Sequence, residues 1–217
     1  MEHCTLNDTE GPIYIGENAL VMEDCMIRGP FALGAGSVMK MGTKIYGATT
    51  VGPYCTIGGE IKNSVIFGNS NKAHDGYLGD SVIGEWCNIG GGTSNSNMKN
   101  NAGTIKLWNP LKNSYLEAGQ KAGLFMGDYS RCAINTSFNS GTVVGVCANV
   151  FGKGLTPAYL SSFSWGYDPE TEYDFEKAIR DIIQWKKLKN QTLSSGESNM
   201  LKDIFDRRNK PGNRTRG

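Results

Sequence analysis

Several features that mark common classes of protein are missing from this sequence of 217 residues. No apolar run approaches the roughly 18 residues that a membrane-spanning helix requires. The first residues do not combine a basic segment with an apolar one, as a signal peptide does. The formal net charge is only +1, and the most basic stretch, 206–217, reads as a solvated tail. We therefore expect neither a membrane nor a nucleic acid as a partner.

Patterns typical of metal sites are missing as well. None of the six cysteines forms a C-x-x-C pair, and the chain has only two histidines, His3 and His74. We therefore predict no zinc site and no other bound metal, and we reject a γ-type carbonic anhydrase, which needs three histidine ligands. The cysteines are interpreted as free, reduced thiols of a cytoplasmic protein.

Glycine, in contrast, is abundant, with 29 residues spread through the body of the chain. A repeat of six residues accompanies it, in which an aliphatic residue is followed four places later by a side chain that is usually small. The aliphatic positions of the first block are Ile15, Val21, Ile27, Leu33, Met39, Ile45, Val51 and Ile57. A helix with 3.6 residues per turn cannot hold an apolar stripe at this spacing.

The repeat continues, with interruptions, to about residue 155. We expect Ile61 in a small position, a register shift of two after Lys62, and aliphatic positions at Val65, Asn71 and Tyr77. After a long interruption the period returns at a methionine, Met126. Four cysteines are placed in the small position and one in an aliphatic position: Cys25, Cys55, Cys87 and Cys147, and Cys132, respectively.

This spacing predicts a parallel β-helix, in which three hexads close one triangular coil and the aliphatic residues stack inside. The pattern resembles the hexapeptide repeat of left-handed β-helix proteins. The fold class is therefore mainly β, with a left-handed parallel β-helix over residues 1–155 and a C-terminal extension over 156–217.

Two segments do not follow the repeat. Residues 95–124 contain the stretches TIKLW and SYLEA on either side of NPLKN, which predicts a hairpin that protrudes from the coils. Residues 169–189 carry apolar side chains at helical spacing, and 194–208 carry a shorter set. We predict two helices there, which cover the open C-terminal end of the β-helix and its strand edges.

The N-terminal end of the repeat has no such cover, because the hexads begin by residue 13 with no helix before them. Repeat arrays usually need polar caps at both ends. Two interpretations stay open: the chain is a fragment that lacks an N-terminal domain, or the segment EHCTLNDTEGP covers the first coil itself.

The stretch from 69 to 97 breaks the repeat with polar residues. Asn71 and Asp75 stand where an aliphatic and a small residue are expected, and His74 lies at the turn of the same hexad. A histidine on a polar turn is most often only solvated. A local rule broken within a regular array is, however, where function or strain is expected.

The polar residues around His74 follow a specific spacing: Glu-x-Lys, then His-x-x-Tyr-Leu-Gly-Asp, then Asn-Ile-Gly-x-Gly-Thr and a further Asn. The residues are Glu60, Lys62, His74, Tyr77, Asp80, Asn88 and Asn97. This arrangement resembles, without a gap, the acetyltransferase half of the bifunctional enzymes that make UDP-N-acetylglucosamine. The resemblance implies an acyltransferase that uses acetyl-CoA or another acyl-CoA on an amino sugar, sugar phosphate or nucleotide sugar.

By this resemblance, His74 is the general base of the reaction. It takes a proton from the sugar amine as the amine attacks the thioester of acetyl-CoA, a task that suits an imidazole. Glu60 orients His74, and Asn97 helps to position or activate the amine.

The resemblance also implies four residues that bind the substrate. Lys44 and Lys62 hold the phosphate as compact positive charges, although the family has an arginine in place of Lys44. Tyr77 and Asn88 bind the sugar. Each of the four also has a plain structural interpretation, with the lysines as solvated turn residues, Tyr77 as an inward core residue and Asn88 as a turn former.

Coenzyme A and the assembly follow from the same resemblance. Gly91, Asp128 and Val146 match the positions that contact coenzyme A along the later coils. In the family this site lies between two subunits of a trimer, so we expect a homotrimer.

One departure from the family pattern keeps a second interpretation open. The family has a lysine that serves the active site where this chain has Gly103, and Lys99 and Lys106 are the candidates to replace it. The alternative is a non-catalytic module for trimerisation or regulation of a sugar nucleotidyltransferase. A nucleotidyltransferase-like domain is also what the resemblance suggests if a domain is missing.

Overall fold

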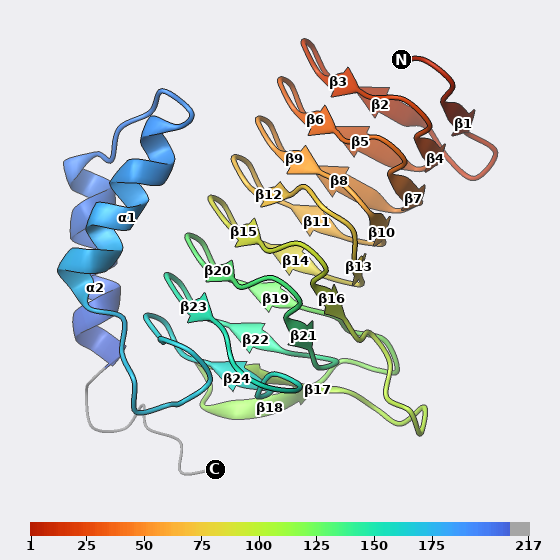
Figure 1. Ribbon diagram of the computed structural model, residues 1–217. Helices are drawn as coiled ribbons and strands as arrows, with labels where there is room; N and C mark the ends of the chain where they lie inside the picture. Colours follow the sequence, from red (N-terminus) through yellow and green to blue (C-terminus); the bar gives the residue numbers. More distant parts are fainter. Residues whose placement is uncertain (209–217) are drawn as a thin grey trace.

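The computed structural model describes residues 1–208, and it has the parallel β-helix that the repeat predicts (Figure 1). Short parallel strands stack into three long sheets, A, B and C, and the chain turns a corner between one sheet and the next. Two helices follow the coils, α1 (Phe175–Lys187) and α2 (Ser195–Arg208). Neither of these helices has the length and apolar composition needed to cross a bilayer.

The strands of each sheet come from successive coils. Sheet A contains β1 (Thr5–Asn7), β4 (Met26–Arg28), β7 (Lys44–Tyr46), β10 (Glu60–Lys62) and β13 (Tyr77–Gly79). Sheet B contains β2 (Ile13–Ile15), β5 (Phe31–Leu33), β8 (Thr49–Val51), β11 (Val65–Ile66), β14 (Val82–Ile83), β19 (Phe125–Met126), β22 (Val143–Val144) and β24 (Tyr159–Leu160). Sheet C contains β3 (Leu20–Val21), β6 (Val38–Met39), β9 (Thr56–Ile57), β12 (Asn71–Lys72), β15 (Asn88–Ile89), β20 (Arg131–Cys132) and β23 (Asn149–Val150).

Two smaller strand pairs complete the β structure of the described residues: β16 (Ser94–Asn95) with β21 (Ser137–Phe138), and β17 (Lys106–Asn109) with β18 (Ser114–Glu117). Because β24 pairs with β22, the coils continue beyond residue 155.

The core is a continuous column inside the coils. Each strand pairs in register with its equivalent one coil away, so inward residues stack directly on one another. One such stack contains Ile27, Ile45, Ile61 and Leu78, none of which is more than 3% exposed. The aliphatic residues predicted from Val21 to Ile57 and from Met126 onward are all buried. Burial of this column and the hydrogen bonds between coils hold the solenoid together.

The predicted register is wrong after Ile57. Only Gly58 and Gly59 separate β9 from β10, whereas four residues separate β6 from β7. Ile61 consequently reaches the core and pairs with Ile45, instead of taking the small position. The next core residues are Ile66, Lys72 and Leu78, whereas the predicted ones, Val65, Asn71 and Tyr77, lie on the outer surface.

The insertion forms the predicted hairpin. Strands β17 and β18 pair in antiparallel register, and the ring of Trp108 lies 5.7 Å from that of Tyr159 in β24. The chain rejoins the coils at Gly123, where a Cβ atom would lie 1.9 Å from the carbonyl oxygen of Gly79 and 2.4 Å from the Ser81 hydroxyl. Only glycine fits at this point of return.

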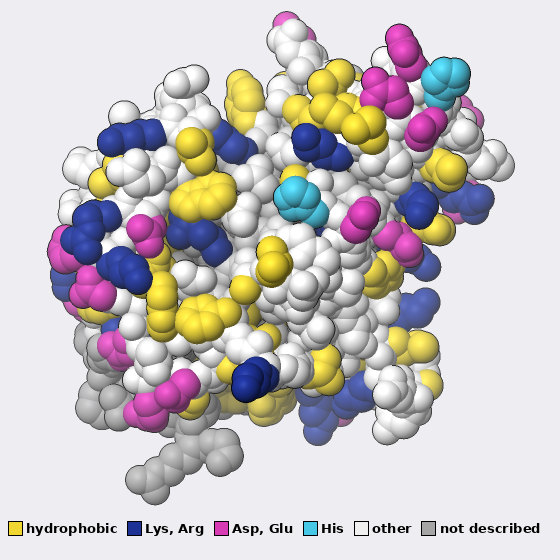
Figure 2. Space-filling view, viewed as in Figure 1, with side chains coloured by type: hydrophobic (Ala, Val, Ile, Leu, Met, Phe, Trp, Pro, Cys, Tyr) yellow, Lys and Arg dark blue, Asp and Glu magenta, His cyan; other side chains and the backbone are white. Residues whose placement is uncertain are grey.

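The two helices form as predicted, but they lie along the side of the coil stack and not over its end (Figure 1). They pack on the corner between sheets B and C, where Trp86, Tyr129 and Phe163 occupy equivalent turn positions with φ near +60°. Basic and acidic side chains are mixed over the helices on the face shown in Figure 2. Most of the predicted basic tail, residues 209–217, lies outside the described residues.

The first helix begins six residues later than the pattern suggests. Asp174 is its N-cap, and the Asp174 carboxylate accepts a hydrogen bond of 2.8 Å from the backbone N–H of Lys177. After the helix, Lys189 donates to the carbonyl oxygens of Tyr54 and Asn69, at 2.5 and 2.9 Å. These bonds tie the segment between α1 and α2 to coils that lie far away in the sequence.

All six cysteines are free thiols, as predicted. Cys25, Cys55, Cys87 and Cys132 belong to the core column. Burial raises the pKa of the Cys55 thiol to about 11, which keeps it neutral. The placement of Cys147 is wrong, because it lies at a turn under the helices and the small position is taken by Ala148.

The return of the insertion offers a test of the packing between coils. Gly123→Ala places a methyl group against one backbone oxygen and one side-chain oxygen, so we expect a loss of about 3 kcal/mol in the free energy of unfolding. Gly196→Ala, at a helical site with open space, is the control, and we expect it to stabilise the protein by about 0.5 kcal/mol. Urea unfolding of both variants measures the difference, and equal stabilities would contradict the close approach.

Candidate active site

A pocket lies where the chain passes from sheet C to sheet A, at the C–A corner. This corner has four residues in five of the coils, 22–25, 40–43, 73–76, 90–93 and 133–136, but only two at Gly58 and Gly59. The short corner leaves a recess of about 290 Å³ between longer ones. The lining residues are Gly42, Lys44, Gly59, Glu60, Asp75, Gly76 and Tyr77.

Both glycines are needed for so short a corner. A Cβ atom on Gly58 would lie 2.5 Å from the carbonyl oxygen of Ala73, in the coil that follows. Gly59 has φ of +73°, a backbone conformation that glycine adopts without strain. The Gly58–Gly59 pair therefore allows the next corner, which contains His74, to lie directly against it.

His74 lies in the corner beside this pocket, and its side chain is exposed. A Cβ atom on Gly91, one coil further, would lie 3.4 to 3.7 Å from three carbons of the His74 side chain. The imidazole therefore lies over Gly91 and remains open to solvent. His74 itself is not one of the residues that line the pocket.

A buried lysine lies behind His74. Lys72 points into the coil and is 3% exposed, and its amine donates to the carbonyl oxygens of Gly58 and His74, at 3.0 and 2.7 Å. These bonds join the short corner to the His74 corner from the inside. Desolvation lowers the pKa of Lys72 to about 8, although the Asp75 carboxylate opposes this effect. The sequence pattern missed this residue because the register slip had assigned the inward position to Asn71.

The polar residues predicted on sheet A divide between its two edges. Lys44, Glu60 and Tyr77 are in register on neighbouring strands and lie at the edge next to the C–A corner. Lys62 is two residues further along its strand, beside Gly79 on the next one. The ion pairs among residues 1–208 involve neither Lys44 nor Lys62.

Tyr77 spans the distance between these edges. A Cβ atom on Gly79 would lie 2.1 Å from the Tyr77 hydroxyl oxygen, so the phenol ring lies flat across Gly79. At the far edge, the side-chain N–H group of Asn97 donates to the Tyr77 hydroxyl at 3.0 Å and also to the carboxylate of Asp80. Burial, followed by the negative charges of Asp80 and Glu60, raises the pKa of Tyr77, so its hydroxyl stays protonated.

The other predicted residues lie around sheet C. Asn88 is on its outer surface, in register with Asn71 and Arg131. Gly91 follows β15 at the C–A corner, whereas Asp128 and Val146 precede β20 and β23 at the opposite corner, next to the helices. Sheet C therefore separates Gly91 from the other two positions.

The structure thus brings together only part of the predicted set within one chain. His74, Lys44, Glu60 and Tyr77 share the C–A corner and the adjoining edge of sheet A. Asn97 meets the set only through the Tyr77 hydroxyl at the far edge.

Neither candidate for the missing lysine points to the pocket. Lys99 donates to the carbonyl oxygen of Thr104 within its own loop, at 2.7 Å, and Lys106 is exposed on the hairpin. Over residues 1–208, no group of three or more His, Cys, Asp or Glu side chains is arranged to hold a metal ion.

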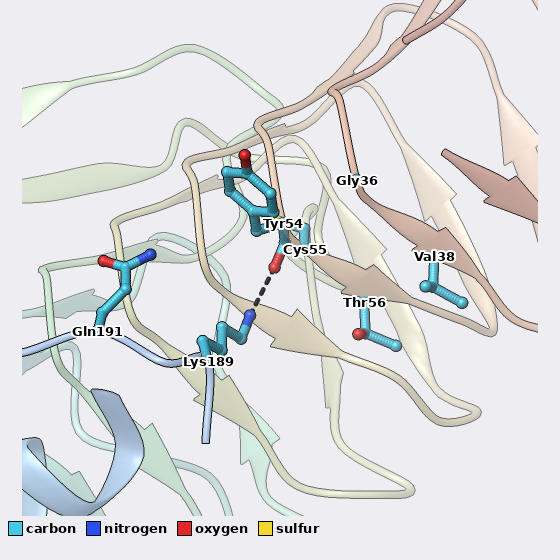
Figure 3. Close-up of a pocket in the computed structure, with 7 residues that line it drawn as sticks. All are labelled: Gly36, Val38, Tyr54, Cys55, Thr56, Lys189 and Gln191. Carbon is cyan, nitrogen blue, oxygen red and sulfur yellow. Dashed lines mark hydrogen bonds between the residues drawn. The ribbon is translucent and has the colours of Figure 1, made fainter. Parts of the chain in front are cut away.

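A larger pocket of about 510 Å³ lies between the coils and the segment after α1 (Figure 3). Val38, Thr56 and Gln191 are among its lining residues. Its amine group, on Lys189, is already bonded to two backbone carbonyl oxygens, and burial lowers the pKa of this lysine. The smaller pocket at the C–A corner is the better candidate, because its charged groups are free to bind a ligand.

Comparisons with known proteins show a likeness to solved structures. No protein-family model and no curated protein matches the chain. A solved structure described as the crystal structure of the polySia specific acetyltransferase NeuO is 13% identical, with a TM-score of 0.35. The match covers 74% of this chain and 75% of that chain. At this TM-score the likeness carries no argument about the chemistry of this chain.

The buried lysine predicts an unusual pH dependence of stability. Its folded pKa of about 8 lies below the value of 10.5 for a free lysine, so between these pH values the unfolded state binds more protons. The free energy of unfolding should therefore rise with pH across this window, by up to about 3 kcal/mol more than in Lys72→Met.

Chemical denaturation at pH 7 and pH 10 measures this difference, because subtraction of the Lys72→Met curve removes the titration of other groups. Lys40→Met is the control, since Lys40 is an exposed lysine at the C–A corner of an earlier coil. Parallel curves for the wild type and Lys72→Met would show that the amine is not held inside the coil.

Proposed function

We propose that the chain is an acyl-CoA-dependent acyltransferase that acts on an amino sugar, a sugar phosphate or a nucleotide sugar, with His74 as the general base. The observation that carries this proposal is the C–A corner, where an exposed imidazole stands beside a polar recess built by a corner two residues short. Lys44, Glu60 and Tyr77 line this recess in one register. The resemblance assigns Lys44 and Tyr77 to substrate binding and Glu60 to the orientation of His74.

The reaction at this corner is a transfer of an acyl group from sulfur to nitrogen. The neutral imidazole of His74 accepts a proton from the sugar amine as the amine nitrogen bonds to the thioester carbon. The bond from that carbon to sulfur then breaks, and the thiolate of coenzyme A receives the proton from the imidazolium. Each turnover leaves His74 neutral and releases an amide and a free thiol.

The substrate phosphate has a place on the outer surface of sheet A. Lys44 and Lys62 are exposed on neighbouring coils, and each supplies a compact positive charge to a phosphate oxygen. Tyr77 lies on β13, the strand after that of Lys62, and contributes a hydroxyl group. Glu60, at the edge of sheet A that adjoins the His74 corner, is assigned the role of stabilising the imidazolium that forms during the reaction.

Coenzyme A is assigned to the outer surface of sheet C. Gly91 marks one edge of that surface, next to His74, and Asp128 and Val146 mark the other. Asn88 lies on the surface between them. In a homotrimer, which we also propose, a neighbouring copy would close this surface into a cleft and bring the groups at the far edge of sheet A toward a second histidine.

One observation favours the non-catalytic alternative. Gly103 stands where the resemblance expects an active-site lysine, and the amine of Lys99 is bonded to Thr104. Under this alternative the coils serve only to assemble or regulate a sugar nucleotidyltransferase, and the polar corner has no turnover.

A pair of matched histidine variants tests the proposal. His74→Asn keeps a polar side chain but removes the base, so we expect the rate of thiol release from acetyl-CoA with glucosamine 1-phosphate to fall about 10²- to 10⁴-fold. His3→Asn is the control, because His3 is exposed and its φ of +52° suits asparagine. Its rate should remain within about twofold of the wild type.

Two outcomes would reject the proposal. Equal rates for His74→Asn and the wild type would remove His74 from the mechanism. Failure of the wild type to release thiol with any amino sugar, while the protein remains folded, would favour the assembly module.

A further inference from the structure

At the far edge of sheet A, the orientation of the Asn97 side-chain amide determines which groups donate and which accept hydrogen bonds. The Asn97 amide has a donating nitrogen and an accepting oxygen, and its nitrogen faces both the Tyr77 hydroxyl and the Asp80 carboxylate. A carboxylate only accepts hydrogen bonds. The reverse orientation would place the Asn97 carbonyl oxygen against the negative charge of Asp80, so that orientation is excluded.

The orientation of Asn97 in turn determines what Tyr77 does with its proton. Because the Asn97 N–H group donates to it, the Tyr77 oxygen acts as the acceptor in this bond. The phenol O–H is then free to donate elsewhere. If Asn97 were reversed, its carbonyl oxygen would take the phenol proton, and Tyr77 would present only an acceptor to a ligand.

Asp80 is well placed to enforce this arrangement. It has φ of +50° at the turn after β13, its backbone N–H donates to Lys62 at 3.1 Å and its carbonyl accepts from Gly123 at 2.8 Å. Its second carboxylate oxygen accepts from the side chain of Asn63 at 2.6 Å. Both carboxylate oxygens are therefore occupied, and the backbone of Asp80 is fixed by the coils on either side.

We infer that Asp80 is a positioning residue, which fixes the Asn97 amide so that Tyr77 presents its O–H as a donor on sheet A. Lys62 pairs in register with Gly79, across which the Tyr77 ring lies. The phenol donor and the Lys62 amine therefore belong to neighbouring strands, whose backbones lie about 4.8 Å apart. This combination fits a phosphate oxygen, which accepts hydrogen bonds and favours positive charge. The inference rests on the proposed function for the identity of the ligand.

The test uses substitutions that keep the backbone relaxed. Asp80→Gly removes the carboxylate at a position with positive φ. Asn63→Gly is the matched control, because Asn63 has φ of +46° and is the other donor to Asp80, but does not contact Tyr77 in the bonds described. Calorimetry with glucosamine 1-phosphate, without acetyl-CoA, measures binding independently of turnover.

We expect the Kd for glucosamine 1-phosphate to rise about tenfold in Asp80→Gly and in Tyr77→Phe, and to stay within twofold in Asn63→Gly. The double variant Asp80→Gly/Tyr77→Phe should bind no more weakly than Tyr77→Phe alone, because Asp80 acts through the phenol proton. Glucosamine without phosphate should show no difference among the variants. Additive losses, or equal losses for both sugars, would overturn the inference.

A second measurement separates this inference from the proposed function. With asparagine labelled by ¹⁵N, the side-chain amide signal of Asn97, assigned by its absence in Asn97→Ala, should shift in Asp80→Gly and remain in place in Asn63→Gly. An unshifted signal in Asp80→Gly would overturn the inference, whatever the activity. If the wild type binds no sugar phosphate, the proposed substrate is wrong, and the amide signal still decides whether Asp80 orients Asn97.

Discussion

Stacking of inward side chains from coil to coil is the constraint on which the rest of the structure depends. Each coil can change its corners, but its strands must stay in register with those of the coils on either side. Insertions and deletions are consequently confined to corners. The long excursion between β16 and β19 obeys this rule, since the chain rejoins the stack at a glycine that fits between two existing coils.

The candidate active site follows from the same constraint. The strands cannot compensate for a corner that is two residues shorter, because they must stay in register. The short corner therefore leaves a recess on the surface. The adjacent corner keeps its full length and presents His74 beside that recess. The cost of this arrangement lies inside the coil, where Lys72 replaces an aliphatic residue and its amine joins the two corners. A polar group buried in this way is tolerated because its hydrogen bonds are made.

Most of the β-helix could be predicted from sequence, because the period of six is a direct record of the stack. The register failed only between Ile57 and Ile83, where short corners move the inward position by an amount that periodicity alone does not give. Gly58 and Gly59 were the visible signal, since adjacent glycines permit an unusually tight turn. Lys72 was missed because inward positions are recognised by their apolar side chains, and lysine is charged.

The helices illustrate a different limit. The apolar face of each helix could be predicted from the sequence. The surface that the helices cover could not, because amphipathic spacing identifies the buried face and not the residues it packs against. The signal lay elsewhere in the chain, in the large aromatic residues Trp86, Tyr129 and Phe163 at equivalent turns. The Asn97 contact was likewise beyond the pattern, since it joins residues on opposite sides of a coil boundary through side-chain atoms.

The position of the helices has a mechanical consequence. In a solenoid without added elements each coil contacts only its immediate neighbours, so the terminal coils can unfold one at a time. Here the Lys189 amine donates hydrogen bonds to the turns at Tyr54 and Asn69. Phe205 of the second helix packs against Phe163, which belongs to a much later coil. The helices and the segment between them therefore couple distant coils. We expect the solenoid to unfold as one cooperative unit instead of one coil at a time.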